Sequence, residues 1–200
     1  MKPVIEYLSD NSVDDALDQK IRGLLTTCFT KPQDVVFKDR RYFQEPYPHR
    51  WVIRNGQGVI VAHIGVHEKG VEAKGTTFRI GGICEVCVYP DYRGRGYIRT
   101  MLNSIHEWLC RHGFVFAVLF GDPLIYGSSG YVQNTNLFLG GGEEGWKQAK
   151  GMIKELSGTP WPGGDVHLPG PKFWEKLAQQ NESLVLSLVC QPLIHDDTAG

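Results

Sequence analysis

The chain has 200 residues and a mass of 22.5 kDa, a size typical of one globular domain that buries its own core. Apolar residues make up 42% and charged residues 22%, which argues against extensive disorder. Lysine and arginine (21) nearly balance aspartate and glutamate (22), so the net charge of −1 excludes binding to nucleic acid or anionic lipid through a bulk positive field.

The sequence gives no sign of a membrane span or a leader. No apolar run reaches the roughly 18 residues that a membrane-spanning helix requires. Residues 1–6 (MKPVIE) lack the apolar core and small-residue cleavage site of a signal peptide. We therefore expect a cytoplasmic protein with neither a membrane nor a nucleic acid as partner.

The first expected element is a helix that begins near Ser12, a good N-cap residue. Apolar residues then recur at helical spacing: Val13, Leu17, Ile21, Leu24, Leu25 and Cys28. Residues 30–48 contain three prolines and many charges, which predicts a loop or a short helix near the surface.

A β-hairpin is expected next. Residues 51–54 and 58–66 are rich in β-branched residues and flank an Asn55-Gly56-Gln57 turn. A second turn is expected at residues 68–70, followed by a long strand over about 76–88.

The middle of the chain predicts a strand, a loop, a helix and a second strand. Residues 90–96 form a polar loop with two glycines, and a helix with one apolar stripe follows and ends at Gly113. Residues 114–120 are continuously apolar, as in a strand that is covered on both faces. This order predicts a βαβ unit with two parallel strands.

The C-terminal part is less regular. A short helical turn is expected up to Gly130, and residues 140–170 hold nine glycines and three prolines. Within them, residues 146–156 predict a short amphipathic helix. Another helix is expected to open at Pro171, and residues 183–190 predict a closing strand. We expect one domain over residues 1–200, with an excursion of uncertain role at about 140–182.

The cysteines and histidines do not predict a metal site. Five cysteines, an odd number, indicate free thiols. Cys84 and Cys87 are spaced as C-x-x-C, but strand residues three apart point to opposite faces. His106-Glu107 resembles the start of a zinc motif whose second histidine is missing. We therefore expect neither a metal nor a redox pair.

Residues 86–99 carry the most chemical information. A buried strand ends, Gly94 and Gly96 turn the chain, and a helix begins, so backbone N–H groups are exposed at the positive end of a helix dipole. Three arginines add positive charge there: Arg93, Arg95 and Arg99. This arrangement predicts a phosphate or pyrophosphate site. The segment has neither the P-loop pattern nor the G-x-G-x-x-G pattern.

The same segment resembles motif A of the Gcn5-related N-acetyltransferase (GNAT) superfamily, written Arg/Gln-x-x-Gly-x-Gly/Ala. Arg93, Gly96 and Ile98 occupy its defining positions, and Ile98 departs from the usual Gly or Ala. A larger side chain there would tighten the space beside the turn between pantetheine and pyrophosphate.

Two further segments support the resemblance. Residues 126–131 (YGSSGY) resemble the family's Tyr-x-x-x-Gly-aromatic segment. Residues 121–123 (GDP) resemble an element of a predicted-acetyltransferase subgroup. The order of elements agrees with the family from about residue 12 to 139.

The resemblance implies an α/β fold of the acyl-CoA N-acyltransferase type, with a mixed, mostly antiparallel sheet flanked by helices. It also implies acetyl-CoA as cosubstrate. The backbone of Val86, Cys87 and Val88 would run beside the pantetheine arm. The pyrophosphate would lie on the loop and the first helical turn: Arg93, Gly94, Arg95, Gly96, Tyr97, Ile98 and Arg99.

The implied reaction is direct attack of a primary amine, on a small molecule or a peptide, on the thioester. The amine must first lose a proton. Glu85, a carboxylate in an apolar strand, is the candidate base, and the alternative is a structural role beside a basic neighbour. Tyr126 is the candidate acid for the leaving sulfur, and the alternative is a packing tyrosine.

Other interpretations stay open at this point. A CoA-binding sensor without turnover is compatible with Ile98, and transfer of a longer acyl chain is a further option. The layout also resembles aminoglycoside 2′-N-acetyltransferases, whose polycationic substrates require an acidic acceptor site. The acidic residues available for it are Glu45, Glu68, Glu72, Glu143, Glu144 and Asp165. His63 and His67 share one strand face and could line a substrate cleft. Many relatives dimerise, so a homodimer is possible.

Overall fold

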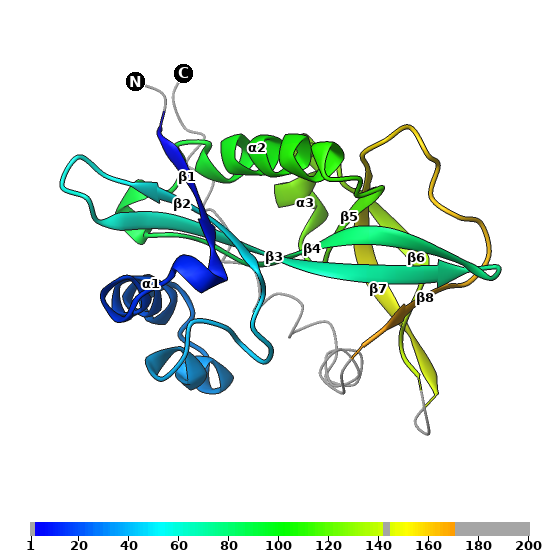
Figure 1. Cartoon of the computed structure of the whole chain (residues 1–200), viewed down its shortest axis with the longest axis horizontal. Helices are drawn as coiled ribbons and strands as arrows, with labels where there is room; N and C mark the ends of the chain where they lie inside the picture. The colour runs from blue at the N-terminus through cyan, green and yellow to red at the C-terminus, as the bar shows by residue number, and fades with distance from the viewer. Residues whose placement is uncertain (1–2, 142–144, 171–200) are drawn as a thin grey trace, which may run out of the picture.

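One eight-stranded sheet runs through the residues described by this computed structural model, 3–141 and 145–170 (Figure 1). Its strand order is β1-β2-β3-β4-β5-β7-β6-β8. The strands are β1 (Ile5–Ser9), β2 (His49–Arg54), β3 (Ile60–Ala73), β4 (Thr76–Val88), β5 (Phe116–Leu119), β6 (Val132–Gly140), β7 (Trp146–Glu155) and β8 (Val166–Pro169). Neighbours are antiparallel except the pairs β4–β5 and β6–β8. The expected mixed, mostly antiparallel sheet is confirmed.

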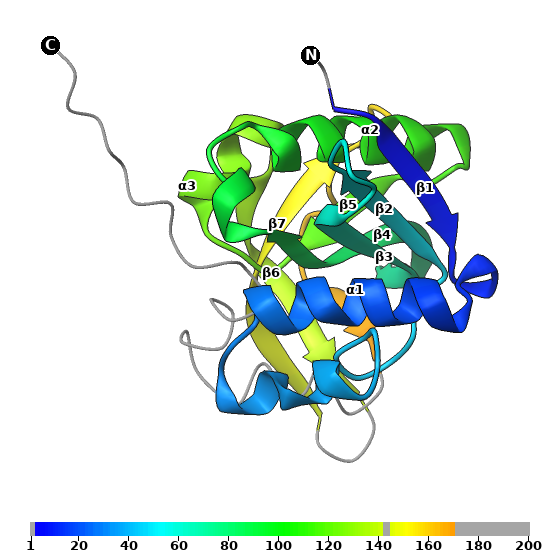
Figure 2. The same ribbon diagram turned by 90° about the vertical axis from the view of Figure 1, so that its left-hand side faces the viewer.

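Two long helices cover opposite faces of the sheet, α1 (Asp15–Cys28) and α2 (Tyr97–Arg111) (Figures 1 and 2). Helix α1 begins later than predicted, because its cap is Asp14, whose carboxylate accepts a hydrogen bond from Leu17 N–H at 2.8 Å. Ser12 lies instead in a 3-10 turn, and its hydroxyl donates to the Ser9 carbonyl. The Pro-rich stretch before β2 contains a 3-10 helix at Pro32–Lys38.

The β2–β3 hairpin is confirmed, with Asn55 at its turn. The Asn55 side-chain oxygen accepts hydrogen bonds from the N–H groups of Gln57 and Val59. The expected turn at residues 68–70 is wrong, because β3 continues to Ala73 and the chain reverses at Lys74 and Gly75, both with positive φ. The polar residues that suggested a turn occupy regular ladder positions opposite β4, and Glu68 forms an ion pair with Arg79.

The predicted βαβ unit is confirmed by β4, α2 and β5. The two strands pair in parallel at only three positions, which end at Gly82 opposite Val118. A Cβ at Gly81 would lie 2.7 Å from Leu109, so this glycine lets α2 pack closely against the sheet. Beyond Gly82, β4 continues to Val88 without β5 as a neighbour, and a gap opens between the two strands.

The described part of the C-terminal excursion adds strands β7 and β8 to the sheet. The helix predicted over residues 146–156 is wrong, because this segment is strand β7, which lies antiparallel between β5 and β6. Its backbone pairs on both edges, and a Cβ at Gly151 would lie 2.8 Å from Leu137, so sheet packing overrides the helical spacing of its apolar residues. The expected helix at Pro171 and strand at 183–190 lie outside the described residues.

A bridge between Glu72 of β3 and His167 of β8 joins the last strand to the tip of the β3–β4 hairpin. The strands β3, β4, β5, β7, β6 and β8 thus form a ring, which we call the closed end. Its interior is an apolar cluster of buried residues: Val71, Ala73, Ile80, Phe116, Val118, Phe120, Leu137, Leu139, Ala149, Ile153, Val166 and Leu168.

The other end of the sheet, where β4 residues 83–88 lie between α1 and α2, is called the open end. A cluster that includes Ile83, Val86 and Val88 packs against α2, and a cluster that includes Cys87 packs against α1. No helix among the described residues is long and apolar enough to cross a membrane.

Candidate functional site

A β-bulge in β4 places Glu85. His63 lies opposite Cys87 and Gly65 opposite Cys84, so Glu85 and Val86 together face the single residue Ile64. Glu85 has φ +49°, a left-handed conformation that costs a non-glycine residue roughly 1–3 kcal/mol. Such strain persists only where the surrounding structure imposes it, and it clusters at functional sites.

The bulge also corrects an expectation about Cys84 and Cys87. They do not point to opposite faces, because the extra residue shifts the alternation. Cys87 packs in the cluster beneath α1, and Cys84 lies on the same side of β4, beside Glu85 in the pocket described below. Among the described residues no group of three or more His, Cys, Asp or Glu could hold a metal ion.

The Glu85 carboxylate is buried and hydrogen-bonded at both oxygens. Phe43 N–H donates to Oε1 at 2.6 Å, and the Tyr47 hydroxyl donates to Oε2. Burial raises the pKa of Glu85 to about 7, against the opposing effects of these two hydrogen bonds and of Arg50. Near neutral pH this carboxyl group therefore populates both its ionised and its protonated form, as a general base requires.

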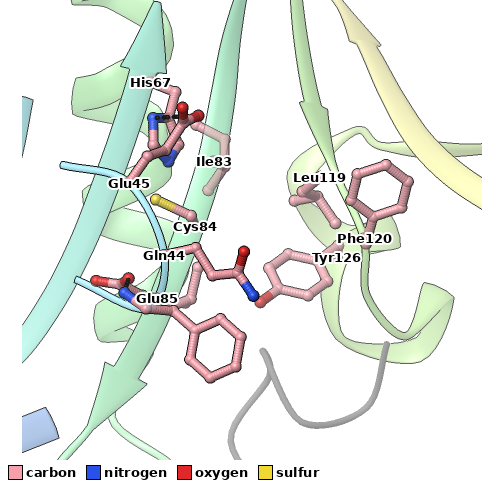
Figure 3. Close-up of a pocket in the computed structure, with 11 residues that line it drawn as sticks. Gln44, Glu45, His67, Ile83, Cys84, Glu85, Leu119, Phe120 and Tyr126 are labelled. Atoms are coloured by element: carbon pink, nitrogen blue, oxygen red, sulfur yellow. Dashed lines mark hydrogen bonds and ion pairs between the residues drawn. The ribbon is translucent and has the colours of Figure 1, made fainter. Parts of the chain in front are cut away.

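Tyr126 lies across a pocket from Glu85 (Figure 3). The pocket is partly open to solvent, and little space is left between its side chains. It opens beyond the last paired residues of β4 and β5. Its lining comprises Phe43, Gln44, Glu45, His67, Ile83, Cys84, Glu85, Val86, Leu119, Phe120 and Tyr126. The two candidate catalytic residues are therefore brought to one cavity.

The segment before Tyr126 explains its position. Asp122 caps the short helix α3 (Pro123–Tyr126) by accepting a hydrogen bond from Leu124 N–H at 2.8 Å. Pro123 occupies the first helical position, as its fixed φ favours. A Cβ at Gly121 would lie 2.4 Å from the Tyr126 ring, so only glycine leaves room for that ring. Residues 121–123 (GDP) thus position the buried Tyr126 at the pocket.

The glycine loop leads from β4 into α2 as predicted. Gly94 and Gly96 have φ +71° and +70°, which favours glycine at both positions. Gly96 is the N-cap of α2, and no described side chain caps this helix end. The first turn of α2 also carries no acidic residue. The positive end of the helix dipole is therefore left available to an anion.

The three arginines of the loop differ in their contacts. Arg93 is half-buried, and its Nε donates to the Val88 carbonyl at 3.3 Å. Arg95 is exposed and its guanidinium lies 4.7 Å from the centre of the Tyr92 ring. Arg99 is exposed on the first turn of α2. Tyr97 and Ile98 are half-buried and pack against the core between α2 and the sheet.

The backbone of residues 86–88 lies on the stretch of β4 that has parted from β5. Val86 and Val88 direct their side chains into the core beneath α2, whereas Cys87 packs beneath α1. This stretch joins the pocket at Glu85 to the loop at Arg93. The candidate CoA-binding residues thus form one continuous path from the pocket to the N-terminus of α2 (Figure 1).

The segment between residues 39 and 48 supplies the part of the site that sequence reasoning missed. Phe43, Gln44 and Glu45 line one wall of the pocket, and Tyr47 contacts Glu85 from behind. Its prolines and charges predicted a loop or a short helix near the surface, and Glu45 was named only as one acidic residue for a polycationic acceptor. No local signal could reveal these contacts, because they join residues about 40 positions apart.

Of the two strand histidines, His67 lines the pocket, and its Nδ1 lies 3.6 Å from a carboxylate oxygen of Glu45. Burial lowers the pKa of His67 to about 3, so this ring is neutral at physiological pH. His63 is fully buried, and its Nδ1 lies 2.9 Å from the Glu85 carbonyl oxygen. His106 contacts the Tyr131 hydroxyl at 2.9 Å.

Comparisons with known proteins identify the family of the chain and agree with its fold. The family model of the acetyltransferase (GNAT) domain matches residues 11–133. A GNAT family N-acetyltransferase from Escherichia coli (YhbS), solved in complex with CoA, is 18% identical with a TM-score of 0.64, over 86% of this chain and 92% of that one. A GNAT family acetyltransferase from Brucella melitensis, in complex with acetyl-CoA, is 18% identical with a TM-score of 0.57, over 82% and 96%.

A third solved structure is an enzyme whose acceptor is a protein. The ribosomal-protein-S18-alanine N-acetyltransferase from Escherichia coli is 16% identical with a TM-score of 0.51, over 78% of this chain and 97% of that one. No curated protein matches the chain in sequence. The family model covers more than half of the 200 residues. The chain therefore belongs to the GNAT acetyltransferase family.

Proposed function

We propose that the chain is an N-acetyltransferase, folded as a single domain, that moves an acetyl group from acetyl-CoA to a primary amine of a small molecule or a peptide. The observation that carries this proposal is the pairing of a buried, bulged carboxyl group, Glu85, with Tyr126 across a pocket at the point where β4 and β5 part.

The cosubstrate follows the path from this pocket to the loop. The pantetheine arm lies along the backbone of residues 86–88, and the pyrophosphate lies at the N-terminus of α2, with Arg93 and Arg99 nearby. Support comes from the uncapped helix end, from the positive φ of Gly94 and Gly96, and from the CoA and acetyl-CoA complexes of the structural neighbours.

The reaction begins with a proton transfer. Glu85 accepts a proton from the acceptor's ammonium group, directly or through one water molecule, and the freed lone pair attacks the thioester carbonyl. The carbonyl π electrons move to oxygen, and on collapse of the tetrahedral intermediate the C–S bond breaks. The Tyr126 hydroxyl donates its proton to the departing thiolate and regains one from the product nitrogen, and Glu85 releases its proton to solvent, so that both side chains return to their starting states.

Thermal unfolding with acetyl-CoA tests the cosubstrate first. At about a hundred times the dissociation constant, binding stabilises the folded state by roughly 2.7 kcal/mol, or a few degrees at this chain length. ATP and NAD, which carry similar phosphates, should give no comparable shift. Arg99→Ala should weaken the effect of acetyl-CoA, whereas Arg111→Ala, at the opposite end of the same helix, should leave it unchanged.

Release of the CoA thiol then tests turnover. A panel of amines, including aminoglycosides and peptides with free N-termini, is supplied with acetyl-CoA and free thiol is measured. We expect release with at least one amine, and a lower rate without loss of acetyl-CoA binding for Tyr126→Phe. Binding without release for every amine would instead support a CoA-binding sensor.

A further inference from the structure

Tyr47 is buried directly behind the candidate base and has no place in the mechanism above. It lies in the segment 39–48 and is 1% exposed. A Cβ at residue 65 would lie 2.5 Å from its ring, so Gly65 makes room for it against β3. The guanidinium of the fully buried Arg50 lies 4.1 Å from the ring centre and is itself bound by Asp10. The ring is therefore held in one position.

The Tyr47 hydroxyl has three hydrogen-bond acceptors within reach. It donates to Glu85 Oε2, and it also lies 3.2 Å from the Arg41 carbonyl oxygen and 3.5 Å from His63 Nε2. A phenol carries one proton, so it can serve only one of them well at a time. The Glu85 carboxylate, as the charged acceptor, is the strongest partner while it is ionised.

His63 supplies an acceptor to this group. Its Nδ1 faces the Glu85 carbonyl oxygen, which can only accept, so Nδ1 carries the proton. Burial lowers the pKa of His63 to about 3, so the ring is neutral and Nε2 has a free lone pair. When Glu85 is protonated, the Tyr47 hydroxyl can therefore donate to the Arg41 carbonyl oxygen or to His63 Nε2 instead.

We propose that Tyr47 is the positioning residue of Glu85, and that its hydroxyl turns from the carboxylate to the Arg41 carbonyl when Glu85 takes up a proton. While Glu85 is ionised, Phe43 N–H and Tyr47 O–H each hold one of its oxygens. After proton uptake at Oε2, the new O–H of Glu85 donates to the Tyr47 oxygen. Glu85 gains one proton in this step. Tyr47 keeps its own proton and changes only its hydrogen-bond partner, so the proton count balances.

The other charged and titratable groups around Glu85 come from several elements. Arg40 and Arg50, before and at the start of β2, both favour its ionised form. Burial raises the pKa of the neighbouring Cys84 thiol, so this group stays protonated and neutral. Burial likewise raises the pKa of Tyr47. Glu85 is thus the member of this group that changes charge near neutral pH.

This inference rests on the proposed role of Glu85 as the base. The titration that tests it can be carried out whether or not Glu85 is the base. The side-chain carboxyl carbons of glutamate are labelled with ¹³C, and the Glu85 signal is assigned by its loss in Glu85→Gln. The signal is titrated in the full chain without acetyl-CoA. We expect Tyr47→Phe to raise the pKa of Glu85 by about one unit, because a hydrogen bond to a charged group is lost.

Tyr42→Phe is the matched control, since Tyr42 lies in the same segment and its ring contacts Arg40 rather than Glu85. Its Glu85 titration should equal that of the original chain. If Tyr47→Phe leaves the titration unchanged while thermal unfolding shows a folded protein, the proposal is wrong. A lower unfolding temperature with an unchanged titration means that Tyr47 only packs, and it also overturns the proposal.

Kinetic measurements distinguish a failure of this proposal from a failure of the proposed function. With an amine found in the thiol-release panel, Tyr47→Phe should move the acidic limb of the pH–rate profile upward by the same unit. It should lower kcat and leave the KM for acetyl-CoA within about twofold, because it changes only the base. If Glu85→Gln keeps full activity while Tyr47→Phe still shifts the titration, the assignment of the base fails and the positioning contact stands.

Discussion

The closed end and the open end of the sheet share strands β3 and β4 but differ in what they bury. The closed end encloses the apolar cluster given above, and its strands form an unbroken ring of pairs. The open end buries Arg50, His63 and Glu85 and contains a bulge, a positive φ and a stretch of β4 that is no longer paired with β5.

The difference shows which part of the fold carries the groups that cost stability and which part supplies it. A buried charge and a left-handed non-glycine residue each cost stability, and neither contributes to packing. The apolar ring supplies stability by burial, at about 25 cal/mol per Å² of apolar surface. Strand β4 passes through both regions, so the packing of its first half holds the strained second half in place.

The largest effect is expected from removing the base at the open end. Glu85→Gln keeps the shape and the hydrogen-bond acceptor but cannot take the proton, so kcat should fall by about 10²- to 10⁴-fold. Thiol release with a fixed amine measures this effect. Acetyl-CoA binding should persist, and Glu107→Gln on the exposed side of α2 should keep full activity.

The reverse pattern is expected at the closed end. Leu137→Ala removes a fully buried side chain and should cost about 2–5 kcal/mol of unfolding free energy. Denaturant unfolding measures the loss. At a temperature where the variant is folded, kcat and acetyl-CoA affinity should stay within about twofold. A large fall in kcat of the folded variant would contradict the assignment of stability to the closed end and catalysis to the open end.

The free energy of unfolding should also depend on pH through Glu85. Its pKa is about 7 in the folded chain and 4.5 as the ordinary value, so the folded state binds more protons between these values. Its contribution to stability is therefore fully present below about 4.5 and is lost as pH rises through 7. Compared with the original chain, Glu85→Gln should gain relative stability from pH 5 to pH 8. Parallel unfolding curves in urea at both pH values would contradict this.

The smallest effect comes from adding one methyl group in two contrasting places. Gly65→Ala forces a Cβ to within 2.5 Å of Tyr47 and should cost about 1–3 kcal/mol. Gly23→Ala, in helix α1, meets no atom within 4 Å and should stabilise the chain by about 0.5–1 kcal/mol. Thermal unfolding of both variants checks the signs, and equal signs would show that the Tyr47 contact is not tight.

The sequence predicted the family and the central part of the fold better than the C-terminal architecture. The glycine loop and the βαβ unit follow from local patterns, since glycines, charges and apolar runs identify them directly, whereas Glu85 and Tyr126 are candidates through the resemblance to the GNAT family. Strand β7 could not be predicted, because Trp146 and Ala149 have helical spacing and only β5 and β6 make the segment a strand. Tyr47 and Phe43 were missed because their contacts with Glu85 depend on the folded chain.

Hydrogen–deuterium exchange with and without acetyl-CoA locates the cosubstrate site without any knowledge of the acceptor amine. We expect slower exchange on binding in residues 83–99 and in the segment around Tyr126, with no change in β6 and β8 of the closed end. Protection centred on β6 and β8, or saturating binding without protection at residues 83–99, would contradict this expectation.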